Sequence, residues 1–368
     1  WNINEESFMQ NVKWIDLLKL RSSYGETGNT TGFGYYSALS TYSYGTPYNG
    51  NPGSSPNNVG NSNLTWEKNK QFNVGLDFGL WEDRFGGTIE YYKRVSSDLI
   101  IPVPLSPTSG FSGGQNENVG SMYNKGYELT LNGKPVATRD FTWTVNFNIS
   151  HNINKVTKLY NHTPISQDTR FNITEGHDVH EFYTRLWAGV NPDNGSPLWY
   201  TDATRQDTTS NSNLAQLSLT GKSASPKYYG GFSNSFKYKS ISLDVDFYYN
   251  FGNYIYNTWE NYLSSDGLYL GSMNQMSTEL NAWQKPGDKT NTPQIIFGGN
   301  MNSNRPSTRY LYSGNYIRLR NIQLSYTLPQ VILDKIKFSN LSVYVRGTNL
   351  FTFATDKYLP NDPELGAS

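Results

Sequence analysis

Long stretches of this chain alternate apolar and polar residues with a period of two. In residues 71–94, every second residue from Phe72 to Leu80 is apolar, a polar break follows at 82–84, and the alternation resumes at Phe85. A period of two places apolar side chains on one face of a β-strand and polar ones on the other. The stretch therefore predicts a β-hairpin whose apolar face either packs into a soluble core or meets lipid.

The same alternation predicts nine strands along the chain. Their approximate ranges are 14–26, 64–80, 85–101, 119–133, 141–153, 228–238, 240–252, 309–328 and 340–354. In the eighth strand the phase slips by one near Arg320, which a β-bulge would explain. The polar faces carry charged residues in mid-strand: Asp77, Glu90, Arg94, Glu128, Asp244, Asp246, Arg318 and Arg346.

The connections between these strands alternate strictly between short and long. The short ones fall at 81–84, 133–140, 239 and 329–340, and the long loops at about 27–63, 102–118, 154–227 and 253–308. Outer-membrane barrels have tight periplasmic turns and long external loops. A soluble sandwich has no reason to place every long loop at one end. We therefore expect an all-β fold, a transmembrane antiparallel β-barrel with long extracellular loops.

Composition agrees with this fold and narrows the partners. The mean hydropathy is −0.63 and no apolar run approaches the ~20 residues of a membrane-spanning helix. Basic and acidic residues number 30 each, so net charge gives no reason to expect nucleic acid as a partner. Nine strands is an odd number, whereas single-chain bacterial barrels have even counts, so we expect the chain to be part of a larger barrel.

Several motifs, in this order along the chain, resemble the SusC-like (RagA-like) TonB-dependent outer-membrane transporters of Bacteroidota. They are WNINEESFMQ, LLKLRSSYGETGN, NSNLTWEKNKQFNVGLDFGLWEDRFGGTIEYYKRVSSDLI, NVGSMYNKGYELTL, PKYYGGFSNSFKYKSISLDVDF, YIRLRNIQLSYTLP and VYVRGTNLFTF. The resemblance covers nearly the whole chain and is weakest in the long loops.

The resemblance implies a 22-stranded barrel plugged by an N-terminal domain, a strand number known for outer-membrane transporters. Residues 1–368 would be its C-terminal portion, with the plug domain and the final strand outside this chain. It also implies an outer-membrane location, a SusD-like surface lipoprotein as a lid, and a dimer of SusCD-type pairs. Energy would come from the TonB complex through the plug region. The implied function is active import of an oligomeric nutrient, a glycan or a peptide.

Two other functions stay open. A passive outer-membrane porin would also suit a charged lumen, and a soluble all-β carbohydrate-binding protein would use the apolar faces as its core. Enzymatic chemistry is not expected, because the chain has no GxSxG, HExxH or Walker motif. His177 and His180 have a spacing that could hold a metal on a helix, but their surroundings favour loop or strand. We expect no catalytic residue, cofactor or metal site.

The aromatic residues of the long outer loops are the candidates for ligand or partner contact. Flat amphipathic rings can stack on sugars or pack against peptide side chains. The same rings can instead hold the loops together. The candidate residues are Trp187, Trp199, Tyr200, Trp259 and Trp283.

Overall fold

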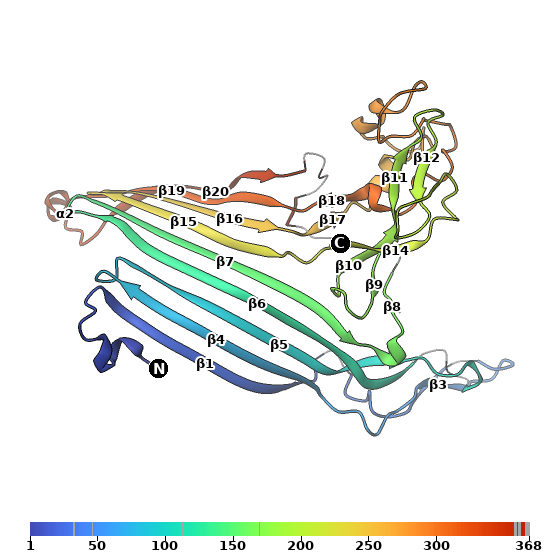
Figure 1. Ribbon diagram of the computed structural model, residues 1–368, viewed down its shortest axis with the longest axis horizontal. Helices are drawn as coiled ribbons and strands as arrows, with labels where there is room; N and C mark the ends of the chain where they lie inside the picture. Colours follow the sequence, from blue (N-terminus) through green and yellow to red (C-terminus); the bar gives the residue numbers. More distant parts are fainter. Residues whose placement is uncertain are drawn as a thin grey trace. The chain divides into compact units, whose positions relative to one another are not determined.

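The computed structural model describes residues 1–31, 34–45, 47–109, 111, 114–168, 170–356, 359 and 362–364. Nine long strands form its largest sheet, in the order β1-β4-β5-β6-β7-β15-β16-β19-β20 (Figure 1). Their bounds are β1 Ile15–Asn29, β4 Glu67–Leu80, β5 Phe85–Val103, β6 Gln115–Ala137, β7 Phe141–Lys158, β15 Tyr228–Tyr238, β16 Ile241–Phe251, β19 Tyr316–Thr327 and β20 Ser342–Ala354. Each overlaps one of the nine predicted ranges, so the strand prediction is confirmed.

The chain divides into two compact units. The first unit comprises Trp1–Gly133, Ser150–Pro164 and Thr174–Val179, and the second comprises Lys134–Ile149, Ile165–Ile173 and His180–Ser368. In the first unit, β1, β4, β5 and β6 are antiparallel neighbours. The pairing of β4 with β5 shows no register shift, and its last pair is Leu80 with Phe85. The predicted tight hairpin is therefore present.

The turn of this hairpin carries an aromatic cluster. Three consecutive residues, Trp81, Glu82 and Asp83, take left-handed backbone angles that reverse the chain within 81–84. The Trp81 ring lies 6.0 Å from Trp14 and 5.8 Å from Phe85, centroid to centroid. Clusters of this kind at one end of the strands are typical of an interfacial aromatic belt. In Figure 1 the loop that carries β3 lies at the opposite end of these strands.

In the second unit, β15, β16, β19 and β20 are antiparallel neighbours. Residue 320 has no partner in either pairing of β19: Leu319 pairs with Phe247, and Asn321 pairs with Asp246. This is the bulge predicted at Arg320. The short connection after β19 contains a helix that the sequence pattern did not predict, α2 Gln330–Ile336. Figure 1 shows α2 at one end of these strands and β17 and β18 at the other.

The segments outside the nine long strands contain many short elements, most of them in the predicted long loops and one, β18, at the start of the predicted eighth strand. The strands are β2 Thr41–Tyr44, β3 Ser54–Asn58, β8 Ile165–Ser166, β9 Asn172–Ile173, β10 Glu181–Arg185, β11 Trp187–Val190, β12 Pro197–Tyr200, β13 Thr208–Thr209, β14 Leu217–Ser223, β17 Tyr254–Tyr256 and β18 Leu311–Ser313. The helices are η1 Ile3–Glu5, η2 Ser7–Met9, η3 Pro107–Ser109, η4 Tyr160–His162, α1 Glu260–Leu263, η5 Ser277–Asn281 and η6 Thr308–Tyr310. Most of these strands are too short to show a period of two.

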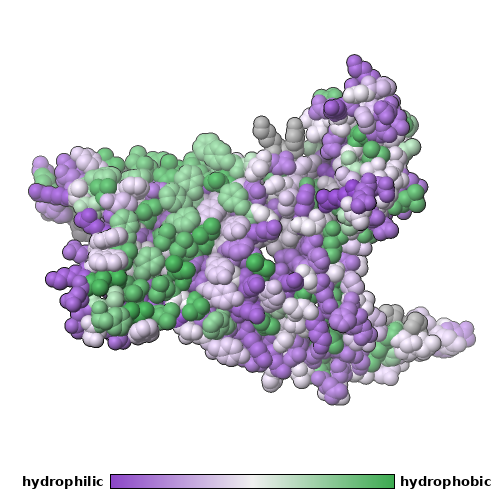
Figure 2. All heavy atoms as spheres, viewed as in Figure 1, coloured by the Kyte–Doolittle hydropathy of each residue, from purple (hydrophilic) through white to green (hydrophobic). Residues whose placement is uncertain are grey.

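The long strands leave their apolar faces exposed. Exposed apolar side chains on these strands include Phe72, Ile89, Leu131, Ile241, Leu324, Val343 and Val345. Figure 2 shows hydrophobic side chains gathered over the long strands and hydrophilic ones over the loop segments. The buried hydrophobic cluster among the described residues lies instead in the second unit's short elements: Phe182, Tyr256, Tyr310 and Leu311. A soluble sandwich would bury the strand faces, so this distribution disfavours that alternative.

No helix among the described residues is both long and apolar enough to span a membrane.

Candidate functional site

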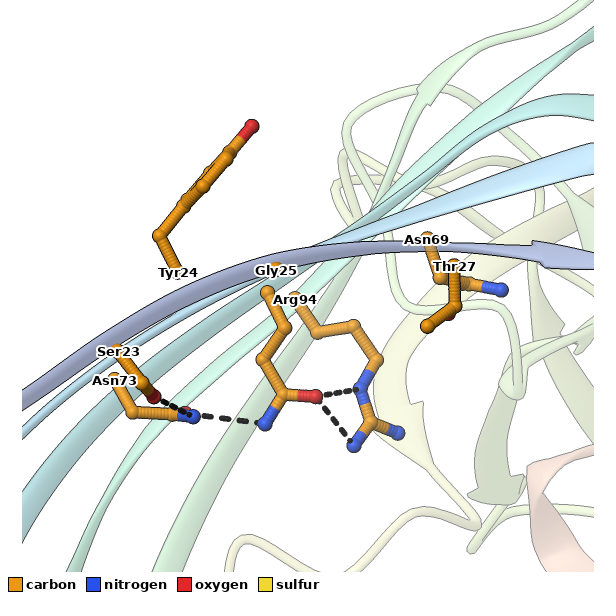
Figure 3. A pocket seen from close by; sticks show the side chains of 8 residues that line it. Ser23, Tyr24, Gly25, Thr27, Asn69, Asn73 and Arg94 are labelled. Carbon is orange, nitrogen blue, oxygen red and sulfur yellow. Dashed lines mark hydrogen bonds between the residues drawn. The ribbon is translucent and has the colours of Figure 1, made fainter.

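A chain of polar side chains crosses β1, β4 and β5 on one face of the first unit. Asn73 donates to the Ser23 hydroxyl at 3.2 Å and accepts from Gln71 at 3.1 Å. Gln71 in turn accepts two hydrogen bonds from Arg94, at 3.2 and 3.1 Å. These residues line a hollow of about 430 Å³, and Figure 3 shows Tyr24 pointing away from Ser23, Asn73 and Arg94, as strand alternation requires.

An ion cluster continues this polar face. Arg21 on β1 forms two hydrogen bonds with Asp77 on β4, at 2.7 and 2.9 Å, and lies 3.4 Å from Glu90 on β5. Gly75 makes room for the guanidinium, because a Cβ at that position would come within 3.1 Å of Arg21 Nη2. Asp77 and Glu90 are among the mid-strand charges predicted from the sequence. Arg21 joins both carboxylates by hydrogen bonds, so the cluster spans three strands.

Other mid-strand polar residues also form hydrogen bonds between strands. In the first unit, the Tyr92 hydroxyl donates to Asn152 at 2.9 Å. In the second unit, Ser235 donates to Asp244 at 2.6 Å, and Arg346 donates to Gln323 at 2.6 Å. Each unit thus has strands with one apolar exposed face and one polar, hydrogen-bonded face, the pattern of a wall between lipid and an aqueous lumen.

The loop segments of the second unit enclose a buried charge cluster. Arg309 forms a bidentate ion pair with Asp266, with Nη1–Oδ2 at 2.5 Å and Nη2–Oδ1 at 2.8 Å. Its side chain is 5% exposed, and its guanidinium lies 5.1 Å from the centre of the Trp187 ring. Glu279 lies 3.9 Å from the same guanidinium, and neither of its carboxylate oxygens has a hydrogen-bond partner among the described residues.

Burial governs the protonation of this cluster. It raises the pKa of Glu279 to about 7; the nearby Asp266 carboxylate adds to the rise and Arg309 opposes it. Burial also raises the pKa of Glu260, which accepts hydrogen bonds from Tyr312 and from Asn257. These loops are therefore built around charged groups removed from water, an arrangement that requires a defined geometry.

The structure divides the five aromatic candidates by exposure. Trp199 is 0% exposed and packs edge-on against Trp187 at 5.5 Å. Trp283 is 7% exposed, and its indole N–H donates to the Pro192 carbonyl at 2.9 Å. These two rings pack inside the short elements of the second unit, β10 to β14 (181–223) and β17 to β18 (254–313), which we call the loop assembly. Trp187 and Tyr200 are half-buried, and the Trp187 indole donates to Asn291 at 2.7 Å.

Trp259 differs from the other four candidates. It is 67% exposed and immediately precedes helix α1, with its ring 6.4 Å from that of Tyr262. Of the five rings, it is the one whose face is most open to a ligand or partner. The sequence interpretation of Trp259 as a contact residue stays a prediction, and the surface it offers is consistent with it.

Sequence reasoning missed the charged members of the loop assembly. Asp266 and Arg309 are 43 residues apart, and nothing in the local pattern around either residue points to the other. No group of three or more His, Asp or Glu side chains among the described residues is arranged to hold a metal ion.

Known proteins are similar to this chain in both sequence and fold. A family model described as "TonB dependent receptor-like, beta-barrel" matches residues 7–177. TonB-dependent receptor P39 of Formosa agariphila is 30% identical over 100% of this chain and 39% of its own length. TonB-dependent receptor SusC of Bacteroides thetaiotaomicron is 26% identical over 99% of this chain and 37% of its own length. The chain thus spans less than half the length of these relatives.

Solved structures of similar proteins also match the fold of this chain. The structure described as the RagAB peptide transporter superposes with a TM-score of 0.86 and 31% identity, over 100% of this chain and 40% of that one. The RagAB peptide importer in its "open-open" state gives a TM-score of 0.87 and 30% identity over 98% of this chain. The family match, the relatives and the strand architecture agree. This chain belongs to the TonB-dependent receptor family and forms part of its β-barrel.

Proposed function

We propose that the protein containing this chain imports an oligomeric nutrient across the outer membrane, as a TonB-dependent transporter of the SusC type. The observation that carries the proposal is the pairing of exposed apolar strand faces with hydrogen-bonded polar faces. The similarity of the whole chain to the RagAB peptide transporter supports it. In this function the apolar faces, including Phe72 and Leu324, meet lipid, and the polar faces line the lumen.

The chain's own residues have two roles in this function. The polar chain from Ser23 to Arg94 and the Arg21–Asp77–Glu90 cluster form a hydrophilic wall. The loop assembly around Arg309 presents a rigid outer surface that includes Trp259. No covalent step is needed, so the protein acts as a transporter and not as an enzyme.

Partners follow from the same family relationship. A SusD-like lipoprotein would cover the outer face, the TonB complex would act through a plug region, and two such pairs would form a dimer. No residue of this chain is assigned to the TonB contact. Both peptide and glycan are candidate cargoes. The similar solved structures are described as a peptide transporter and a peptide importer, and the glycan is the other oligomer that the sequence resemblance implies.

Uptake by intact cells tests the function and the cargo together. Cells with and without the full-length gene would be given fluorescent oligopeptides of 5–15 residues, or oligosaccharides of similar mass, at limiting concentration. Gene-dependent accumulation of either class supports import and names the cargo. If cells with and without the gene accumulate the peptides to the same level, and likewise the oligosaccharides, the proposal is contradicted.

Conductance separates the transporter from a passive porin. The full-length protein, reconstituted in a planar bilayer, is expected to be nearly silent because a plug occupies the lumen of such barrels. Steady ion conductance would favour the porin instead.

A further inference from the structure

Two arginines from distant parts of the chain converge on one short segment of the loop assembly. Arg185, the last residue of β10, donates from Nε to the carbonyl of Ser212 at 2.9 Å. Arg305 donates from Nη1 to the side chain of Asn213, the next residue, at 2.5 Å. The backbone at Arg185 also forms a parallel bridge with Ser307, two residues beyond Arg305. All of these residues belong to the second unit.

Neither guanidinium has an acidic partner within the described part of the chain. The other buried or half-buried arginines of this unit each have an acidic partner. The pairs are Arg170 with Asp168, Arg309 with Asp266, Arg318 with Asp362 and Glu364, and Arg320 with Glu364. Both Arg185 and Arg305 are half-buried. Burial lowers the pKa of Arg185, and the charge of Arg305 lowers it further, so the two cations are close enough to repel each other.

The segment that the two arginines contact, Ser212 and Asn213, also contains a buried polar group without a hydrogen-bond partner in the part of the chain that the structure describes. The Ser212 hydroxyl is 1% exposed and has no hydrogen-bond partner among the described residues. A buried hydroxyl without a partner and two half-buried cations without counter-charges are each unfavourable on their own. An anion with several acceptor oxygens would neutralise the two guanidinium groups, because Arg presents donors in a fork that matches a carboxylate.

We propose that Arg185 and Arg305 form a carboxylate-binding subsite of the loop assembly, and that the cargo of this transporter carries a carboxylate there. The proposal rests on the proposed import function and adds the chemical class of the ligand. The carboxylate can come from an acidic peptide or from a uronate-containing glycan. A single Arg–carboxylate pair already confers orientation, and two arginines favour an acid over its neutral analogue.

Direct binding tests this subsite without transport. The full-length protein with its lid partner would be titrated by calorimetry with two matched ligand pairs. One pair is a ten-residue peptide with a single Asp and its Asn counterpart, both amidated at the C-terminus. The other is a hexagalacturonate and its methyl ester. We expect the acid of at least one pair to bind about 10-fold more tightly than its neutral partner.

Variants assign the preference to residues. Arg305→Gln is expected to remove most of the preference while leaving the affinity for the neutral ligand unchanged, and Arg305→Lys to keep part of it. Arg185→Gln should act in the same direction, with circular dichroism as a check on folding. Arg205→Gln is the matched control, since it removes an exposed arginine of the same loop assembly and should leave the preference intact.

Three outcomes would overturn the subsite: equal binding of acid and neutral ligand in both pairs, no binding of any of the four, or an unchanged preference in the Arg185 and Arg305 variants. The cargo source follows from which pair shows the preference. Binding that is intact while gene-dependent uptake is absent would count against the import function alone. The two proposals can therefore fail separately.

Discussion

Arg309 and Asp266, 43 residues apart in sequence, form a bidentate ion pair at 2.5 and 2.8 Å with almost no exposure to solvent. Removing one partner of such a pair leaves an uncompensated buried charge, whose cost is about 3–5 kcal/mol. We therefore expect Asp266→Asn to destabilise the loop assembly by roughly that amount, measured as increased hydrogen exchange in residues 253–308.

A surface pair provides the control for this prediction. Asp140 and Lys239 lie 4.0 Å apart with both side chains more than half exposed. Asp140→Asn should change stability by less than about 1 kcal/mol, because solvent screens exposed pairs. Similar losses of stability in Asp140→Asn and Asp266→Asn would contradict the prediction, because burial of the Arg309–Asp266 pair would then add nothing to the cost of breaking it.

Glu279 gives the loop assembly a pH dependence. Its pKa is raised from 4.5 to about 7 by burial and by Asp266, against the attraction of Arg309. A carboxyl with a raised folded-state pKa stabilises the fold fully below pH 4.5, and this contribution is lost as the pH rises through about 7. The difference corresponds to about 3 kcal/mol. Local stability of 253–308 should therefore fall between pH 5 and pH 8 in hydrogen-exchange measurements.

Glu279→Gln is the control, because an amide of the same shape cannot ionise. Its loops should show a flatter stability profile over this range and exceed the wild type at pH 8. The prediction fails if wild type and Glu279→Gln have parallel profiles.

The two faces of β4 are expected to respond differently to a new charge. Val74 lies on the apolar face and Asn73 on the polar face, where it hydrogen-bonds to Ser23. Val74→Arg should cost about 2–4 kcal/mol near mid-membrane, and Asn73→Arg far less. Reversible unfolding in lipid vesicles measures both, and equal losses at 73 and 74 would contradict the lipid-facing assignment.

Exposure separates the roles of two tryptophans. Trp199 is fully buried, so Trp199→Ala should destabilise the loops by about 3–5 kcal/mol, as large-to-small core substitutions do. Trp259 is largely exposed, so Trp259→Ala should leave stability unchanged and weaken ligand binding up to about 10-fold, with Trp259→Phe retaining most of the affinity. Thermal unfolding and calorimetry together test this, and unchanged binding in Trp259→Ala would remove Trp259 from the contact surface.

The long strands could be predicted from the sequence because each repeats its pattern over 11 to 23 residues. The bulge at Arg320 could also be predicted from the sequence, because it shifts the phase of the alternation by one residue. Helix α2 could not be predicted in this way. Its seven residues are too few to show a helical period, and they lie where a short turn was expected.

The interior of the loop assembly was less accessible to sequence reasoning. Asp266 and Gly267 take left-handed backbone angles, which an Asp-Gly pair favours in a turn. The pairing of Asp266 with Arg309 depends on how several short strands fold together, which no local pattern encodes. For the same reason the sequence could identify Trp199 and Trp259 as loop aromatics but could not tell the buried ring from the exposed one.

The proposed function requires that the TonB complex drives import through this barrel. Accumulation of the labelled cargo would be measured in cells carrying the full-length protein and its lid, with the TonB complex present and then genetically removed. We predict that accumulation falls to the level of cells lacking the transporter and returns when the TonB complex is restored. Accumulation that continues undiminished without the TonB complex would contradict the account and point to passive diffusion.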